Sequence, residues 1–176
     1  MKLIIILASA ILLSGCRDNA ATSPAFEMGA LDISHRGATG PEVPFIAPDG
    51  RTVTLAAYRG RPLIVNLWAT WCAPCVSEMP ALDKLADREG DRVQVLAVSQ
   101  DSDGAKAVAP FFARMEFEHL QPYLDPPNRI GIAIGSDTLP TTIFYDASGH
   151  EAWRVLGAMN WNGERAQTLI KGTLGG

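Results

Sequence analysis

An apolar segment that runs directly into two closely spaced cysteines constrains the fold of this chain more than any other feature. Residues 63–68 are rich in β-branched and other apolar side chains, which predicts a strand buried on both faces. Cys72 and Cys75 follow it, and a helical pattern runs from about Ala73 to Arg88. Unpaired N–H groups at the start of such a helix favour a thiolate at Cys72, while the first turn shields Cys75. The spacing therefore predicts a redox pair in which Cys72 is the nucleophile and Cys75 resolves the mixed disulfide.

Two other interpretations of the cysteine pair need more than the sequence offers. Half of a zinc site requires two further ligands, yet the chain has one other cysteine, Cys16, and three histidines scattered singly. A purely structural bridge across so short a loop would constrain the unfolded chain little. We therefore expect no metal site and no bound cofactor.

The first sixteen residues are typical of a secreted protein. Lys2 and the apolar stretch from Leu3 to Leu13 form the charged and hydrophobic regions of a signal peptide. The stretch is too short for a spanning helix, which needs about 20 apolar residues. It ends in Leu-Ser-Gly-Cys16, which resembles the lipobox of bacterial lipoproteins and implies a lipid on Cys16. The alternative is an ordinary signal peptide with an incidental cysteine.

The composition after Cys16 changes from small, turn-forming residues to a globular pattern. Leu31 and Ile33 could add a short strand at the edge of the domain. We expect three segments: a lipoprotein signal peptide at 1–15, a lipid-anchored flexible tether at 16–40, and one domain at 41–176.

The charge of the chain bears on its partners. The formal net charge is −4, and it becomes −5 once Lys2 leaves with the signal peptide. A mildly acidic domain offers no basic surface that would attract nucleic acid or anionic lipid, so we expect no nucleic-acid partner. Membrane attachment would come from the lipid.

Strand and helix patterns alternate through the domain. Residues 45–46 and 53–55 flank an Asp-Gly turn and predict an N-terminal hairpin. The whole pattern predicts an α/β fold with a mixed sheet covered by helices on both faces. The other expected elements are strands at 93–98, within 121–127, at 141–145 and at 151–156, and helices at 105–115, 128–134 and 163–171.

Residues 63–80 resemble the active-site segment of the thioredoxin superfamily and, more narrowly, of its membrane-anchored TlpA/ResA-like branch. The similarity covers roughly residues 43–172 and includes Pro80, which matches a proline in the active-site helix, and the Leu139-Pro140-Thr141-Thr142 segment. It implies a thioredoxin-like fold, a central mixed β-sheet flanked by helices with an N-terminal hairpin and a central insertion. It also implies a thiol–disulfide oxidoreductase.

The resemblance assigns the contacts with a protein substrate. Pro140 matches a cis-proline, and the backbone of Leu139 would offer an edge to which the partner's cysteine-bearing segment pairs as a strand. Thr141 belongs to the same substrate-binding loop. Trp71 would shape the rim of the sulfur pocket.

Asn66 departs from ordinary thioredoxins, which carry a buried aspartate at this point. Because an asparagine cannot take up a proton, deprotonation of Cys75 needs another base. Glu78 lies one helical turn beyond Cys75 and matches an acid of the ResA-like branch. Partial burial would raise its pKa towards the range of a general base. The alternative is a solvent-facing glutamate without a catalytic role.

The resemblance also implies a place and partners for the protein. It would act on the periplasmic face of a bacterial membrane and reduce the disulfides of exported proteins, either apocytochrome c or a copper-assembly protein. Because that compartment is oxidising, a membrane electron donor of the DsbD or CcdA type would have to recharge it. Two alternatives stay open: a disulfide-forming oxidant, and a copper(I)-binding metallochaperone.

Overall fold

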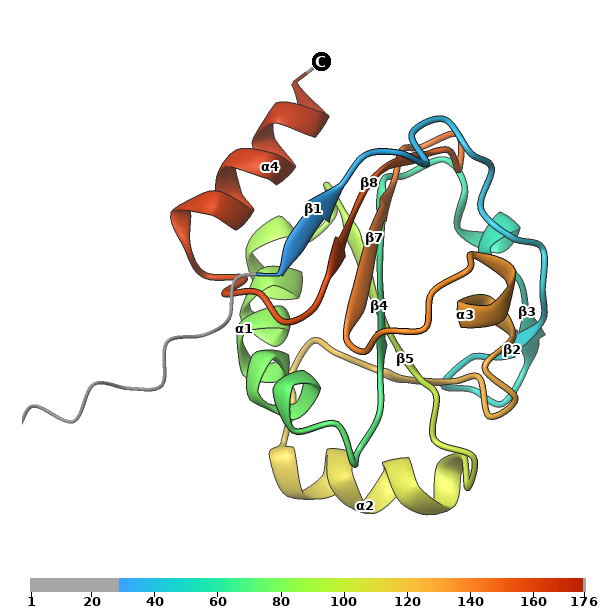
Figure 1. Ribbon diagram of the computed structural model, residues 1–176. Coiled ribbons are helices and arrows are strands. Elements are labelled where there is room, and N and C mark those ends of the chain that lie inside the picture. The colour runs from blue at the N-terminus through green and yellow to red at the C-terminus, as the bar shows by residue number, and fades with distance from the viewer. Residues whose placement is uncertain (1–28, 176) are drawn as a thin grey trace, which may run out of the picture.

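The computed structural model describes residues 29–175, which fold around one eight-stranded mixed sheet (Figure 1). The strand order is β1-β8-β7-β4-β5-β6-β2-β3. The strands are β1 (Ala30–Asp32), β2 (Phe45–Ile46), β3 (Thr52–Val53), β4 (Leu63–Trp68), β5 (Gln94–Ser99), β6 (Pro122–Leu124), β7 (Thr141–Tyr145) and β8 (Glu151–Leu156). The helices are the 3-10 helix η1 (Leu55–Tyr58), α1 (Ala73–Glu89), α2 (Ala105–Met115), α3 (Arg129–Ala133) and α4 (Glu164–Leu174).

Strand β4 is the centre of the sheet. It pairs in parallel with β5 and antiparallel with β7, and all six of its residues are buried. A strand covered on both faces needs apolar side chains at odd and even positions alike, which explains the nearly unbroken apolar run of residues 63–68. The carboxyl end of β4 leads directly to the cysteines at the start of α1.

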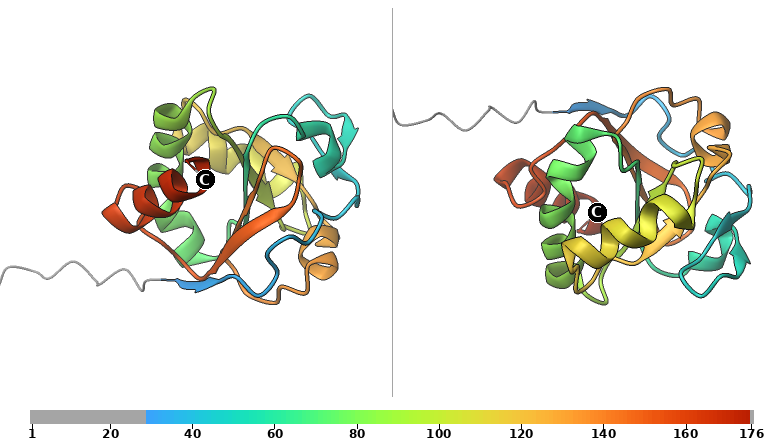
Figure 2. Two further views of the ribbon diagram at one scale, coloured as in Figure 1. Left: turned by 90° about the horizontal axis from the view of Figure 1, so that it is seen from above. Right: turned by 90° about the horizontal axis from the view of Figure 1, so that it is seen from below.

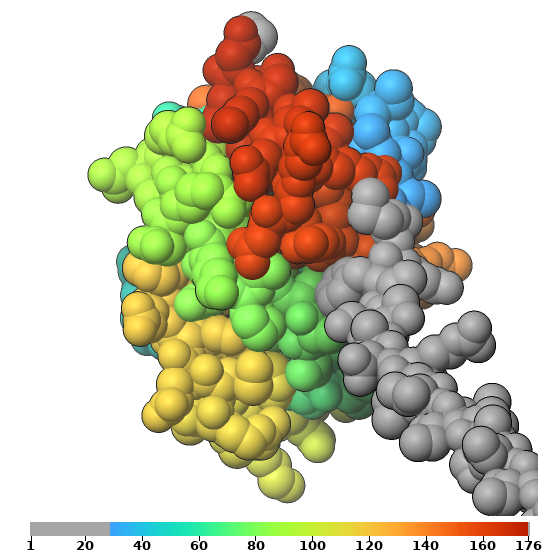
Figure 3. Space-filling view, turned by 90° about the vertical axis from the view of Figure 1, so that its left-hand side faces the viewer, coloured from blue at the N-terminus to red at the C-terminus, as the bar shows by residue number. Residues whose placement is uncertain are grey.

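The two faces of the sheet pack against different helices. On one face, Ile64 and Trp68 join a core with α1, α2 and α4; on the other, Leu63, Val65 and Leu67 join a core with η1, α3 and the β2–β3 hairpin. Figure 2 shows the hairpin and α3 across the sheet from α1 and α4. In Figure 3, α4 (red), α1 (green) and the α2 region (yellow) form a continuous outer layer.

The observed elements confirm the expected thioredoxin-like arrangement, including the N-terminal hairpin. The folded part, however, begins before residue 41, where the sequence placed the domain boundary. Strand β1 pairs with β8, and Thr39 forms an isolated bridge with His150. Leu31 is in this edge strand as expected, whereas Ile33 follows it. The expected signal peptide, the lipid site at Cys16 and the first part of the tether lie outside the described residues.

Several element boundaries differ from expectation by one to three residues, among them those of β5 and α4. Strand β5 runs one residue later than 93–98, and α4 continues three residues beyond the expected end at residue 171. Within residues 29–175, no helix is both long enough and apolar enough to span a membrane.

Candidate active site

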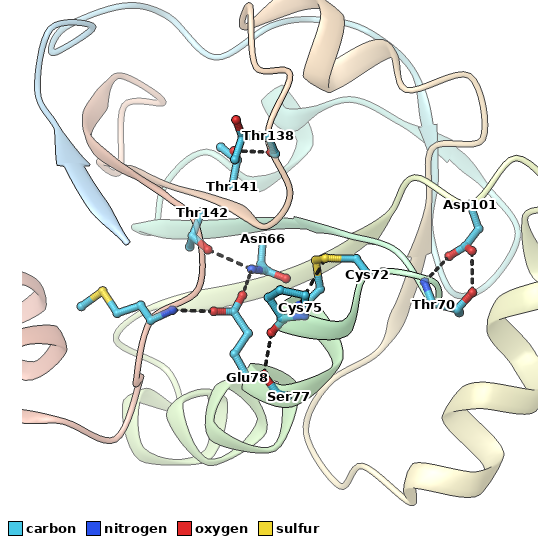
Figure 4. The surroundings of a disulfide bond; sticks show 12 residues. Asn66, Thr70, Cys72, Cys75, Ser77, Glu78, Asp101, Thr138, Thr141 and Thr142 are labelled. Atoms are coloured by element: carbon cyan, nitrogen blue, oxygen red, sulfur yellow. Dashed lines mark hydrogen bonds between the residues drawn. A yellow bond between two sulfur atoms is a disulfide. The ribbon is translucent and has the colours of Figure 1, made fainter. Parts of the chain in front are cut away.

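The two cysteines lie at the start of α1 and are joined by a disulfide (Figure 4). Cys72 is the N-cap residue of α1, and its sulfur accepts the backbone N–H of Cys75 at 3.3 Å. Pro74 occupies the first turn, where a missing N–H costs no intrahelical hydrogen bond. Cys72 keeps 7% of its surface exposed and Cys75 none. A partner can therefore approach the outer sulfur, Cys72, while the inner one is enclosed.

A buried aspartate that the sequence analysis missed holds the loop before Cys72. The Asp101 carboxylate accepts the backbone N–H and the hydroxyl of Thr70 at 2.9 and 2.6 Å, and the hydroxyl of Ser99 at 2.8 Å. This cluster lies on the opposite side of the disulfide from Glu78 (Figure 4). Its sequence signal was available, because Asp101 follows the carboxyl end of a buried strand beside β4, where sites in α/β sheets gather.

Glu78 is fully buried, which excludes the solvent-facing alternative. Its carboxylate accepts hydrogen bonds from Asn66 Nδ2 at 2.8 Å, from the Met159 backbone N–H at 2.9 Å, and from Trp161 Nε1 at 3.1 Å. Burial raises the pKa of Glu78 to about 7, since these three hydrogen bonds offset only part of the cost of desolvating the charge. The carboxyl group can therefore take up or release a proton near neutral pH.

Asn66 joins Glu78 to the centre of the sheet. Its Nδ2 donates to Glu78 Oε1 and to Thr142 Oγ1, each at 2.8 Å. Its Oδ1 is buried and has no hydrogen-bond partner among the described residues. Figure 4 shows the Asn66 side chain between Glu78 and the disulfide. Asn66 is thus placed to orient the carboxylate on the side of Cys75.

The loop before β7 faces the cysteines. The Leu139–Pro140 peptide bond is cis, as the resemblance implied, and the Pro140 carbonyl accepts the N–H of Gly157 at 2.8 Å. Thr141 is fully buried, and its hydroxyl donates to the Thr138 carbonyl at 2.7 Å, within the loop. The hydroxyl of Thr141 therefore holds the loop, and its residue is paired with Leu67 of β4 and Leu156 of β8, so Thr141 supports the loop from inside the sheet.

The structure brings the expected site residues within 29–175 together around the carboxyl end of β4, and Cys16 lies outside the described residues. Trp71, on the rim, is 70% exposed. Met159 and Trp161 were not foreseen, because nothing in their local sequence connects them with Glu78. Within residues 29–175, no group of three or more histidine, cysteine or acidic residues is arranged to hold a metal ion.

Comparison with known proteins places this geometry among thiol–disulfide exchange proteins. The profile of the Redoxin family matches residues 24–170. The chain is 31% identical over 126 residues to the thiol-disulfide oxidoreductase ResA of Geobacillus thermodenitrificans, covering 70% of each chain. It is 34% identical over 99 residues to the thiol:disulfide interchange protein DsbE of Pseudomonas fluorescens biotype C. That match covers 56% of this chain and about half, 53%, of the relative.

Solved structures share the fold. A putative thiol:disulfide interchange protein DsbE from Chlorobium tepidum superposes with a TM-score of 0.71 at 23% identity, over 82% of this chain and 99% of the other. The exposed lipoprotein thioredoxin Etrx1 of Streptococcus pneumoniae gives a TM-score of 0.63 at 24% identity, over 74% of this chain and 99% of the other. At these identities the likeness establishes the thioredoxin-like fold.

Proposed function

Because the chain belongs to the Redoxin family, as a TlpA/ResA-like member of the thioredoxin superfamily, we propose that it reduces the disulfides of partner proteins through Cys72 and Cys75. One observation carries the proposal. The accessible sulfur of Cys72 caps α1, and a buried carboxyl group whose pKa is about 7 lies one turn beyond Cys75 on the same helix. A structural disulfide needs no such proton acceptor.

The reaction proceeds by two exchanges. The Cys72 thiolate attacks the partner's disulfide, so a mixed disulfide forms, the partner's S–S bond breaks, and the released partner thiolate takes up a proton. The Cys75 thiolate then attacks the Cys72 sulfur and releases the second partner thiolate, which is also protonated. Two electrons pass to the partner, and the chain is left with its Cys72–Cys75 disulfide.

Glu78 acts on the second exchange. Cys75 is enclosed, so its thiol has little access to water as a proton acceptor. An ionised Glu78 accepts that proton, and the hydrogen bond from Asn66 keeps the carboxylate in place. The proton returns from Glu78 to Cys75 when the membrane donor has reduced the pair again.

The partner binds along the loop before β7. The backbone of Leu139 pairs with an extended segment that carries the target disulfide, and Pro140 has no N–H to compete beside the sulfurs. Thr141, which begins β7 between β4 and β8, holds this loop in place from inside the sheet. Trp71 covers one side of the bound segment with its exposed ring.

The protein works at the periplasmic face of a bacterial membrane, held there by a lipid on Cys16. The lipobox-like sequence before Cys16 supports this placement, and Etrx1, which shares the fold, is named an exposed lipoprotein. Its partners are exported proteins with a disulfide, apocytochrome c or a copper-assembly protein. A membrane donor of the DsbD or CcdA type returns two electrons to the Cys72–Cys75 pair.

Trapping the mixed disulfide tests this function. In cells, Cys75→Ser is expected to accumulate partners bound through Cys72, and the matched Cys72→Ser variant is expected to trap none. Purified, reduced wild-type protein should also reduce insulin. Failure to reduce insulin or a small disulfide, together with a strongly oxidising potential of the pair, would contradict the reductase role and favour a disulfide-forming oxidant.

A further inference from the structure

A pocket of about 170 Å³ opens at the carboxyl end of β4, on the face of the sheet that packs against α3 and away from α1. Trp71, the residue before Cys72, and Leu139, the residue before the cis-proline, both line it. A cavity of about 150 Å³ is large enough to hold a benzene molecule. One side chain of a bound partner segment therefore fits in the pocket while a neighbouring cysteine reacts with Cys72.

An unpaired hydrogen-bond acceptor lies at this pocket. The Gln100 side chain lines it and is 7% exposed; its Nε2 donates to the Val98 carbonyl, and its Oε1 has no partner within residues 29–175. A buried acceptor without a donor is costly, so a donor from outside is favoured here.

The charge and shape of the pocket narrow the kind of donor. Asp137 contributes a carboxylate to the lining, and no lysine or arginine is among the described residues that form it. The walls from Trp71 and Leu139 suit an aliphatic stem, and the exposed indole of Trp71 attracts a cation to its face. A cationic side chain with an apolar stem satisfies all of these features.

We propose that this pocket is a specificity subsite that accepts a lysine or arginine side chain close to the target cysteine of the partner protein. The subsite rests on the proposed reductase function and adds to it a class of substrate. A glutamate at the same position of the partner would be repelled by Asp137 and would leave the Gln100 acceptor unpaired.

Peptide disulfides of one parent sequence test the subsite. The residue beside the reacting cysteine is varied between lysine, alanine and glutamate, and the second-order rate constant for oxidation of the reduced full-length chain by each peptide is measured. We expect the lysine peptide to be reduced about tenfold faster than the glutamate peptide, an effect typical of one partly exposed charge interaction with added hydrogen bonding. Asp137→Asn should narrow this ratio, and Asp137→Lys should invert it. Gln100→Met, which removes the acceptor at similar volume, should lower the rate with the lysine peptide.

Asp91→Asn is the matched control. It removes the same charge next to Arg61 and before β5, at the opposite end of the sheet from the cysteines, and should leave the lysine-to-glutamate ratio unchanged. Because Asp137 is exposed, its variants report on the subsite even if Gln100→Met does not fold. Equal rates for the three peptides would overturn the subsite and leave the reductase function intact. Failure to reduce any of the peptides would overturn both the subsite and the reductase function. If Asp91→Asn changed the lysine-to-glutamate ratio as much as Asp137→Asn does, the preference would come from the overall charge of the protein and the subsite would be overturned.

Discussion

The two sides of the Cys72–Cys75 disulfide differ in burial and in how completely their polar groups are hydrogen-bonded. On the side of Glu78, every group is buried and the carboxylate accepts three hydrogen bonds from distant parts of the chain. On the side of Trp71, the indole is 70% exposed and the Gln100 acceptor lacks a partner among the described residues. The side of Glu78, the closed side, can control proton transfer to and from Cys75 regardless of which partner is bound. The side of Trp71, the open side, gains its missing hydrogen-bond donor only from a partner. Substitutions on the two sides should therefore have different signatures.

The largest effect should come from the charge of Glu78 and be visible in stability. A pKa of about 7 in the folded protein lies above the ordinary value of 4.5, so the folded state holds this proton more tightly than the unfolded chain. That stabilisation is fully present below pH 4.5 and is lost as the pH rises through 7. The shift corresponds to about 3 kcal/mol of unfolding free energy. Urea unfolding of the oxidised protein should show Glu78→Gln gaining this amount relative to wild type between pH 4.5 and 8.

An exposed acid provides the control for this pH series. Glu118 has 85% of its side chain exposed, so Glu118→Gln should follow the wild-type curve. If the unfolding free energies of Glu78→Gln and wild type depended on pH in the same way, the Glu78 carboxyl group would not be desolvated. Its side of the disulfide would then be open to water.

The same substitution should slow the chemistry by about 100-fold, the lower range for loss of a general base. Oxidation of the reduced pair by a small disulfide should accelerate in the wild type as the pH rises through about 7, because only ionised Glu78 accepts the Cys75 proton. Stopped-flow tryptophan fluorescence measures this rate. In Glu78→Gln the inflection near 7 should vanish, whereas attack by Cys72 in a Cys75→Ser background should be little changed. An unchanged inflection would assign the pH dependence to another group.

The Glu78 side of the disulfide also shows which features could be predicted from the sequence and which could not. Strand β4 and helix α1 were predictable because each is specified by its own segment: an apolar run, and a helical pattern that begins with a proline in its first turn. The position of Glu78 one turn beyond Cys75 followed from the same helix. Its burial did not, because Met159 and Trp161 reach it from 81 and 83 residues further along the chain.

The edge of the sheet shows the same limit. Strand β1 has three residues and an ordinary local sequence, and it is defined by its pairing with β8. A tether and an edge strand look alike in such a segment until the partner strand is known. The open pocket could not be foreseen either, since Gln100 and Asp137 meet there only because the end of β5 and the start of β7 lie at the same end of β4.

A smaller effect is expected from the hydrogen bond that Trp161 donates. Trp161→Phe removes the Nε1 donor from the Glu78 carboxylate and keeps most of the buried ring. The folded protein should lose about 1–3 kcal/mol at pH 8, where the carboxylate is charged, with a smaller loss at pH 5. Urea unfolding at the two pH values measures the difference. The pKa of Glu78 should rise further in this variant, moving the inflection of the oxidation rate to higher pH. A loss that is equal at both pH values would indicate altered packing in place of the missing hydrogen bond.

The smallest effect on stability should come from a substitution on the open side. Such a substitution should weaken partner binding without changing the stability of the fold. Trp71→Ala removes a ring that is 70% exposed, so the unfolding free energy should change by less than about 0.5 kcal/mol. The rate with a small uncharged disulfide tests attack by Cys72 alone, and the rate with a lysine-bearing peptide also depends on the wall that Trp71 supplies to the pocket. Trp71→Ala should therefore lower the second-order rate constant several-fold more for the peptide than for the small disulfide. Trp71→Phe, which keeps an aromatic face, should recover part of the difference. A loss of stability comparable to that of Trp161→Phe would show that the rim is part of the closed structure, and the contrast between the two sides of the disulfide would fail.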